Sequence, residues 1–323
     1  PTAQLTQLLA WLERYRAYQN SPEGCGVRFF IADTQAAIAA SGVKSNDKGR
    51  PISVTPEAGA RLKDADRRLR ELTEFENDFT ELAANRRMSI ILAIAIRETP
   101  DRDPAKLTSF ENCYLLALLE VAELNEELKT PEVMDEPEKA ARLRKKHYVA
   151  AVRAIDRGLK LVKPTDPPKE VLDARIMLVY ANFVAGENYH AAVLGEHLAR
   201  SMTRSGRGAL PALYALQAYR NVMLKSKAHG AANEAELQTD REHVRRVATW
   251  MEATWPNDTP TDTARHTLGT LYFADGDYAK ALETYARVTP NYASLAFLRN
   301  EQGIACFNLQ KDPKAPAQTK KDW

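Results

Sequence analysis

Apolar residues recur at intervals of three and four along most of the chain, the spacing that places them on one face of an α-helix. In the N-terminal half this pattern predicts helices over residues 2–19, 28–40, 56–97, 104–129 and 138–162. In the C-terminal half it predicts pairs of helices: 171–185 with 191–202, 210–224 with 235–254, and a last pair that begins near residue 262. Residues 42–55 are polar and lack the periodicity, so a loop is expected there. The expected fold is therefore all-α.

The predicted helix 56–97 carries an extended apolar stripe. Thr55 and Pro56 suit its start, because a threonine hydroxyl can cap the first turn and proline fits the first helical position. The stripe runs between charged flanks through Leu62, Ala65, Leu69, Leu72, Phe75, Phe79 and Leu82. Such a stripe needs another helix to cover it. A hairpin with residues 104–129 is the simpler interpretation, and a coiled coil with a second chain is the alternative.

Charge is distributed unevenly over the middle of the chain. Residues 111–140 hold nine acidic and two basic side chains, whereas residues 141–163 hold eight basic side chains and one acidic. The basic block read alone resembles a face for nucleic acid or acidic lipid. Two adjacent antiparallel helices of opposite charge explain both blocks more simply, and we favour this interpretation.

The run from Leu268 to Ala281 predicts a compact helical hairpin. Gly269 offers a place where a second helix can approach closely, and Gly276-Asp277 interrupts the helical pattern. A second apolar stripe starts at Tyr278 and continues through Tyr285. The sequence therefore predicts two helices that pack tightly on each other at Gly269.

This run resembles a tetratricopeptide repeat, whose pattern joins L-G-x-x-Y in a first helix to G-D-Y-x-x-A in a second. Gly303 follows Gly269 by 34 residues, the period of that family. Residues 171–202 resemble a looser copy with one residue inserted at the turn. The resemblance implies an α-solenoid over residues 164–310, after an N-terminal helical region 1–163. A polar tail, 311–323, is expected to be disordered.

In the tetratricopeptide family the first helix of each repeat lines a concave face that binds other proteins or peptides. The resemblance implies that such a groove is lined here by His266, Thr270, Phe273, Ala274, Asn300, Ile304, Phe307 and Asn308. The protein's own C-terminal segment or a neighbouring subunit is the alternative occupant of this groove. Trp323, at the end of the tail, is either a docking anchor or part of a disordered end.

The overall charge balance argues against a nucleic-acid partner, because 45 Lys and Arg side chains are matched by 43 Asp and Glu. No apolar segment reaches the roughly 20 residues that a membrane span needs. Cys25, Cys113 and Cys306 are widely separated, which is typical of proteins in a reducing compartment. A cytoplasmic location is expected, and a signal peptide cleaved before Pro1 is the open alternative.

The sequence lacks the motifs of phosphate loops, dinucleotide sites, zinc proteases and serine hydrolases. Glu187 and His190 have the E-x-x-H spacing of di-iron proteins, and His197 lies seven residues beyond His190. A single copy at a predicted turn is a weak metal signal, so no catalytic residue, cofactor or metal is expected. The favoured function is a non-catalytic adaptor or scaffold subunit. A structural subunit of an oligomeric assembly comes second, and a helical metal-binding enzyme third.

Overall fold

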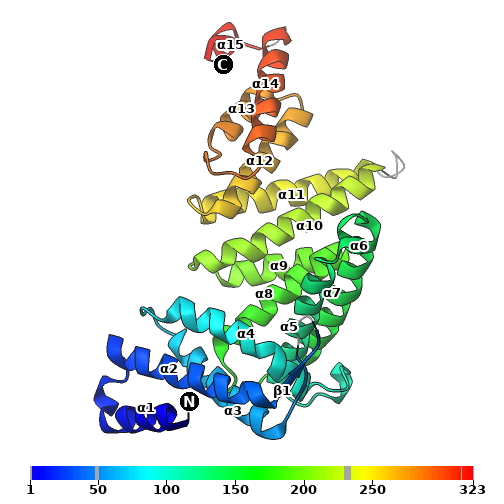
Figure 1. The fold of residues 1–323 in the computed structure, drawn as a ribbon. Helices are drawn as coiled ribbons and strands as arrows, with labels where there is room; N and C mark the ends of the chain where they lie inside the picture. The colour runs from blue at the N-terminus through cyan, green and yellow to red at the C-terminus, as the bar shows by residue number, and fades with distance from the viewer. Residues whose placement is uncertain (1, 48–50, 229–233, 314, 323) are drawn as a thin grey trace. The chain divides into compact units, whose positions relative to one another are not determined.

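The computed structural model describes residues 2–47, 51–228, 234–313 and 315–322, and these form α-helices along most of their length (Figure 1). The all-α prediction is confirmed. The chain divides into two compact units, Pro1–Pro167 and Pro168–Trp323. The division falls within the proline-rich segment 163–168, where the sequence analysis separates the two halves.

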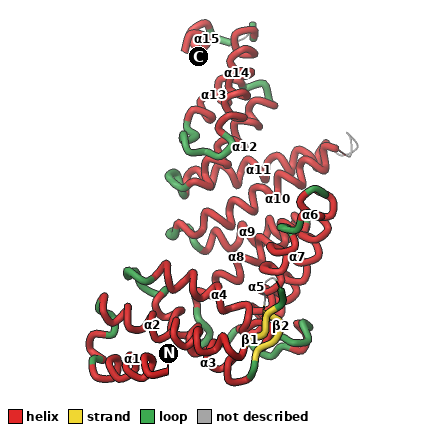
Figure 2. Tube along the Cα trace, viewed as in Figure 1, coloured by secondary structure: helices red, strands yellow, loops and turns green. Residues whose placement is uncertain are grey.

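The N-terminal unit combines seven described α-helices with one small antiparallel sheet, drawn in yellow in Figure 2. Its elements are α1 (Thr2–Arg14), α2 (Pro22–Ala39), β1 (Val43–Ser45), β2 (Pro51–Val54), α3 (Pro56–Leu72), α4 (Thr80–Glu98), α5 (Phe110–Glu127), α6 (Pro131–Met134) and α7 (Pro137–Leu159). Short 3₁₀ turns cover Arg16–Tyr18, Ala40–Gly42 and Pro104–Lys106.

Hydroxyl caps set several helix starts in this unit. The Thr55 hydroxyl accepts a hydrogen bond from the Ala58 N–H at 3.3 Å, as the sequence predicts. Ser21 caps α2 in the same way, accepting from the Gly24 N–H at 3.2 Å. The predicted start of this second helix at residue 28 is wrong. The Ser21-Pro22 pair has the same hydroxyl-then-proline signature as Thr55-Pro56 and begins the helix six residues earlier.

The expected loop 42–55 contains the antiparallel strands β1 and β2. Val43 pairs with Val54, and Lys44 pairs with Ser53. The Thr55 N–H then donates to the Gly42 carbonyl at 2.9 Å, which joins the sheet to the start of α3. Val54 is buried against the helices, and this burial holds the hairpin on the unit. Residues 48–50 of the expected loop lie outside the described residues.

The predicted helix 56–97 is wrong as one element, because the chain turns back between α3 and α4. Asn77 organises the turn: its amide nitrogen donates to the Leu72 carbonyl at 2.8 Å, and its amide oxygen accepts from the Phe79 N–H at 2.9 Å. A side-chain amide that bonds local backbone in this way competes with the helical ladder. The apolar spacing continues across Asn77, which is why periodicity alone misses the break.

The apolar stripe of α3 is covered inside the N-terminal unit. It packs on α2 and α4, whereas the predicted partner is residues 104–129. Ion pairs tie α3 to α4 in antiparallel order, Lys63 to Glu98 at 2.8 Å and Arg87 to Asp66 at 2.7 Å. Leu82, at the end of the predicted stripe, is exposed instead.

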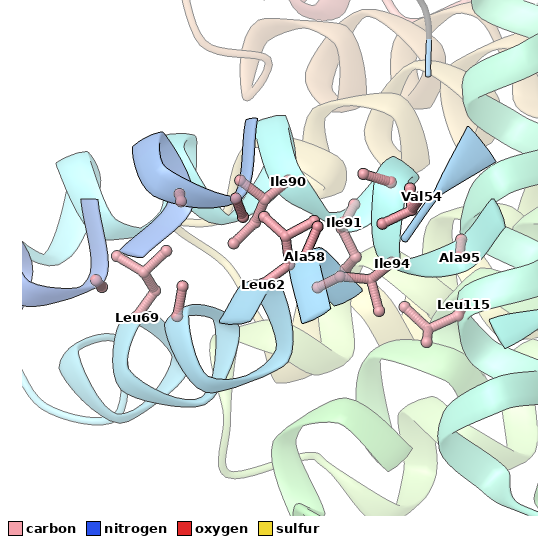
Figure 3. Packing of buried hydrophobic residues seen from close by; sticks show 14 of the residues in the cluster. Val54, Ala58, Leu62, Leu69, Ile90, Ile91, Ile94, Ala95 and Leu115 are labelled. Atoms are coloured by element: carbon pink, nitrogen blue, oxygen red, sulfur yellow. The ribbon is translucent and has the colours of Figure 1, made fainter. Parts of the chain in front are cut away.

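The core of this unit lies where α2, α3 and α4 meet (Figure 3). Leu62 of α3 lies near Ile90 and Ile91 of α4, while Leu69 of α3 lies at one end of the cluster and Leu115 of α5 at the other. Burying each of these side chains contributes about 1.5–3 kcal/mol. Because the apolar stripe of α3 is buried inside this unit, it is not available for a coiled coil with a second chain.

The helices of opposite charge, α5 and α7, pack side by side. Gly158 permits the close approach, since a Cβ there would lie 2.8 Å from the Cβ of Cys113. Between these helices, the imidazole of His147 lies 2.7 Å from Glu120 and 3.4 Å from Glu127. The following basic residues of α7 are exposed: Arg142, Arg144, Lys145, Lys146 and Arg153. The predicted adjacency of the two helices is therefore found.

The C-terminal unit consists of helices packed in chain order. Its elements are α8 (Pro168–Ala185), α9 (Asn188–Ser201), α10 (Ala209–Ala228), α11 (Glu234–Thr254), α12 (Thr259–Ala274), α13 (Tyr278–Ala286), α14 (Leu295–Lys311) and α15 (Ala317–Asp322), with a 3₁₀ turn at Gly206–Gly208. From α8 to α14 each helix packs on its predecessor, and α8, α10, α12 and α14 also contact one another in succession.

Two hairpin turns share one backbone geometry. Gly186 and Gly276 adopt φ values of +87° and +79°, which glycine reaches without strain. Each glycine N–H donates at 3.1 Å to the carbonyl three residues earlier, and the next N–H donates at 2.9 or 3.0 Å to the carbonyl five residues earlier. The α8–α9 and α12–α13 hairpins are thus alike at their turns.

The residue insertion predicted after Gly186 is absent. α9 begins at Asn188, two residues after Gly186, just as α13 begins at Tyr278, two residues after Gly276. Asn188 is buried, whereas Tyr189 is 59% exposed. Aligning Tyr189 with Tyr278 shifts the register by one residue, because the buried Asn188 occupies the position where the repeat pattern has an aromatic residue.

Candidate functional site

Gly269 of α12 is the contact point between α12 and α13. A Cβ at this position would lie 2.2 Å from Cε1 of Tyr285, far inside van der Waals contact. Tyr285 is 1% exposed, and its ring occupies the space that the missing side chain leaves. The close approach predicted from the sequence is therefore present.

A half-buried polar cluster joins α12, α13 and α14 beside this contact. Glu301 of α14 accepts a hydrogen bond from the Tyr285 hydroxyl at 2.9 Å. His266 Nε2 lies 3.0 Å from the same carboxylate, and the Thr270 hydroxyl lies 3.2 Å from it. His266 Nδ1 is 2.9 Å from the Tyr292 hydroxyl, so an imidazole protonated on Nε2 satisfies both contacts.

The electrostatics of this cluster keep Glu301 charged. Burial alone would favour the neutral carboxyl, but hydrogen bonds from His266 and Tyr285 outweigh it and hold the pKa of Glu301 below its ordinary value. Burial and the adjacent carboxylate raise the pKa of Tyr285, so its hydroxyl remains a donor. The cluster is a fixed polar contact between helices, and α14 covers it.

The outer face of α14 is open. Phe307 is 58% exposed and Ile304 is 44% exposed. Around them lies a shallow hollow of about 560 Å³, lined by Arg299, Asn300, Gly303, Ile304, Phe307 and Asn308. A Cβ on Gly303 would have no atom within 4 Å, so nothing in the described chain fills the space that Tyr285 fills at Gly269.

The residues predicted to line one groove therefore fall into two sets. His266 and Thr270 point at Glu301 and are covered by α14, while Phe273 is half-buried and packs edge-on against Tyr278 at 5.4 Å. Ala274 is exposed at the end of α12. The α14 set lines the open hollow: Asn300, Ile304, Phe307 and Asn308. We call this second set, with Arg299 and Gly303, the α14 face.

Glu187, His190 and His197 do not form a metal cluster. Glu187 and His190 lie 3.9 Å apart at an exposed helix start, and His197 is exposed further along α9. Among the described residues, the group with metal-ligand spacing is Glu120, Glu123 and His147 in the N-terminal unit. This group is not among the predicted metal ligands, although Glu120 and Glu123 share a helical face and His147 is the only histidine in the basic block 141–163.

Glu196, the neighbour of His197, belongs to a different network. It accepts hydrogen bonds from Arg200 at 2.7 Å, from the Tyr219 hydroxyl at 3.1 Å and from both terminal nitrogens of Arg246. Burial would raise its pKa, but the bonds from Arg246, Arg200 and Tyr219 prevail and lower the pKa of Glu196 to about 2. This carboxylate ties α9 to α10 and α11.

Because the pKa of Glu196 is lower in the folded chain than its ordinary value, its stabilising effect is complete above the unfolded-state pKa and is lost as the pH falls toward about 2. We expect the free energy of unfolding to decline between about pH 5 and pH 3, and to decline less steeply in Glu196→Gln. Urea unfolding across this range measures both slopes. Glu283→Gln, at an exposed site on α13, should keep the wild-type slope. Equal slopes in all three proteins would contradict the assignment.

The tail expected to be disordered forms α15 in part. Lys320 Nζ donates to the Gln310 carbonyl at 3.1 Å, which places this helix next to the end of α14. Trp323, the possible docking anchor, lies outside the described residues.

The chain matches no protein-family model, no curated protein and no solved structure.

Proposed function

We propose that this protein is a non-catalytic, tetratricopeptide-like adaptor or scaffold subunit that binds a helix of a partner protein on the α14 face. The observation that carries the proposal is the contrast between two glycines 34 residues apart. Gly269 is covered by Tyr285 of α13, whereas Gly303 has open space beside it. A repeated hairpin would place a further helix there, and a partner helix can take that position.

The chemistry of the α14 face favours an amphipathic helix that carries acidic residues. Ile304 and Phe307 offer apolar contact area, and burying such side chains contributes about 1.5–3 kcal/mol each. The charged side chains exposed on α14 are basic, Arg299 and Lys311, and Lys311 lies 4.0 Å over the Phe307 ring. The acidic residue of α14, Glu301, is turned inward to His266 and Tyr285. An apolar stripe flanked by carboxylates complements this face.

The test uses the double variant Ile304→Glu with Phe307→Ala. Both side chains are exposed, so the fold should persist while the apolar contact disappears and a like charge faces the partner. Affinity isolation at low salt, followed by quantitative mass spectrometry, should show a stoichiometric partner reduced tenfold or more, which corresponds to about 1.4 kcal/mol of binding free energy.

A matched control lies on α9, where Val193 and Tyr189 are 60% and 59% exposed. The double variant Val193→Glu with Tyr189→Ala makes similar changes, an aliphatic residue to glutamate and an aromatic residue to alanine, elsewhere in the C-terminal unit and should retain the partner. If both double variants retain the partner, the α14 face is not its binding site. If both double variants lose the partner, binding depends on the overall charge of the protein and not on the α14 face.

A second copy of this chain is the alternative occupant, which corresponds to a structural subunit of an oligomeric assembly. Light scattering of purified protein over a range of concentrations distinguishes the two. A concentration-dependent dimer that is abolished by Ile304→Glu with Phe307→Ala would favour self-assembly. A monomer at all concentrations leaves the face to another protein.

The cysteines agree with the cytoplasmic location that we propose. Cys25, Cys113 and Cys306 are all free thiols. Burial raises the pKa of the Cys25 and Cys113 thiols, which keeps them in the unreactive protonated form. In the described part of the chain, no helix has both the length and the apolar character required to cross a membrane.

A further inference from the structure

A second polar cluster, in the N-terminal unit, has the features of a cation site. Three glutamates on α5, Glu120, Glu123 and Glu127, share one helical face because they are spaced by three and four residues. This face meets His147 of α7. Oxygen atoms of Glu120 and Glu123 and a ring nitrogen of His147 lie within 4.8 Å of one another.

His147 is oriented as metal-binding histidines are. Its Nδ1 lies 2.7 Å from Glu120 Oε2, a contact that leaves Nε2 as the free ring nitrogen. Carboxylate–histidine pairs of this kind fix the ring and make the opposite nitrogen a better ligand. The side chain is 2% exposed, and Nε2 is buried without a hydrogen-bond partner. An unsatisfied buried ring nitrogen is costly, and a bound cation would satisfy it.

A second ligand already stands opposite that nitrogen. Glu127 Oε2 lies 3.4 Å from His147 Nε2. This distance is long for a good hydrogen bond, but it fits two ligands that each lie about 2.0–2.2 Å from one zinc-type ion. Glu127 keeps 38% of its side chain exposed, so it can exchange a cation with solvent.

Two adjoining cavities provide the route for an ion. Glu127 lines a cavity of about 700 Å³ between α4, α5 and the β1–β2 hairpin. Glu123 lines a second cavity of about 250 Å³ together with Arg102. Asn46 and Pro51 border both cavities. The cluster therefore lies at the inner edge of accessible space while His147 itself is shielded.

We infer that this cluster binds one divalent transition-metal cation of the zinc type, with His147 Nε2 and Glu127 as its protein ligands, Glu120 holding the imidazole in position and Glu123 adding negative charge beside the ion. The mixed nitrogen and carboxylate ligands suit such ions better than Mg²⁺ or Ca²⁺, which prefer oxygen ligands alone. The site is separate from the α14 face, so its test does not depend on the proposed partner.

Arg102 offsets the negative charge of Glu123 beside this site. Its two terminal nitrogens bind the Glu123 carboxylate at 2.6 and 2.7 Å, so a positive charge lies close to the position proposed for the cation. Arg102 also has a φ of +49°, a left-handed conformation that costs most residues energy but that asparagine tolerates. Arg102→Asn therefore removes this positive charge and keeps a residue suited to that backbone.

The experiment titrates ZnCl₂ into the metal-free full chain, purified without a histidine tag, by isothermal titration calorimetry. We expect one equivalent of Zn²⁺ to bind, with Mg²⁺ giving no comparable binding. Glu127→Gln should weaken Zn²⁺ binding tenfold or more, and His147→Gln should abolish it. Arg102→Asn should strengthen binding, which a purely structural role for these residues would not produce.

The controls address folding and adventitious binding. His147 is buried, so circular dichroism must show a folded variant. Glu127→Gln, at a partly exposed position, provides the test if His147→Gln does not fold. His197→Gln, which removes an exposed histidine on α9, should leave Zn²⁺ binding unchanged. Absence of saturable Zn²⁺ binding in the wild type would overturn the inference, as would binding that is lost in His197→Gln but retained in Glu127→Gln.

Discussion

Replacing Gly269 with alanine is expected to lower the free energy of unfolding by roughly 1–3 kcal/mol, although alanine is the better helix former. The added Cβ would lie 2.2 Å from Tyr285 Cε1, so α12 and α13 must separate or the buried ring must move. The ring cannot move freely, because its hydroxyl is bound to Glu301 at 2.9 Å. Urea unfolding followed by circular dichroism measures the change.

Gly303→Ala makes the same chemical change 34 residues later and should have the opposite sign. The position lies inside α14, and a Cβ there would have no atom within 4 Å. Only helix propensity then acts, and it favours alanine by about 0.8–1 kcal/mol. The pair of variants separates the packing effect from the propensity effect. A loss of stability in Gly303→Ala would show that α14 is covered where the structure leaves it open.

A double-mutant cycle with Tyr285→Ala identifies the cause of the Gly269 effect. Tyr285→Ala alone should cost about 3–5 kcal/mol, because a buried aromatic ring is lost. In that background the steric clash at residue 269 disappears, so Gly269→Ala should cost little or become favourable. Additive effects of the two substitutions would mean that Gly269 is constrained by something other than the Tyr285 ring.

The local features that the sequence predicts are those that depend on a few neighbouring residues. Gly269 predicts a close contact between helices, Gly276 predicts a turn, and Thr55-Pro56 predicts the start of a helix. The structure contains all three features. Each follows from backbone sterics or from a single hydrogen bond. The spacing of apolar residues likewise distinguishes helices from strands, so the all-α class could be predicted.

The failures occur where a polar side chain overrides the spacing. Asn77 breaks helix 56–97 because its amide bonds the backbone locally, yet the apolar period continues across it. Asn188 fills a buried position where the repeat pattern expects Tyr189. Neither event changes the periodicity of apolar residues, so a pattern based on that periodicity cannot detect it.

The candidate site could likewise not be predicted from the spacing of apolar residues, because it depends on how three helices pack. The resemblance to a repeat family assigns His266 and Ile304 to one groove, but α14 packs over His266 and leaves Ile304 outside. Glu301 accounts for this packing of α14. Its carboxylate is hydrogen-bonded to His266 at 3.0 Å and to the Tyr285 hydroxyl at 2.9 Å, which holds α14 against α12 and α13. Its role depends on three helices meeting, and no local sequence signal specifies that.

Asp262→Ala is expected to cost about 3–5 kcal/mol, a large effect for a polar residue, because it breaks a buried ionic network. Asp262 is 1% exposed. Its carboxylate accepts from the Arg265 side chain at 3.1 Å, from the Thr289 N–H at 3.1 Å and from the Thr289 hydroxyl at 2.5 Å. The residue lies near the start of α12, where the helix dipole also favours a negative charge.

These bonds make Asp262 the link between α12 and the segment that leads into α14. Without the carboxylate, the Thr289 N–H loses this acceptor, and Arg265 keeps the Pro256 carbonyl at 2.7 Å and Glu252 at 3.2 Å. Asp262→Asn should cost less, about 1–2 kcal/mol, because its amide oxygen still accepts from the Thr289 N–H while the charge is lost.

The order of the two Asp262 variants is therefore the informative result, and urea unfolding against Glu283→Ala as an exposed acidic control measures it. An equal, large loss in Asn and Ala would assign the effect to the charge that faces Arg265. An equal, small loss would mean that α14 is held by the Glu301 cluster alone. The expected result, a large loss in Ala and an intermediate one in Asn, would show that the α14 face is positioned at two independent points, Asp262 and Glu301.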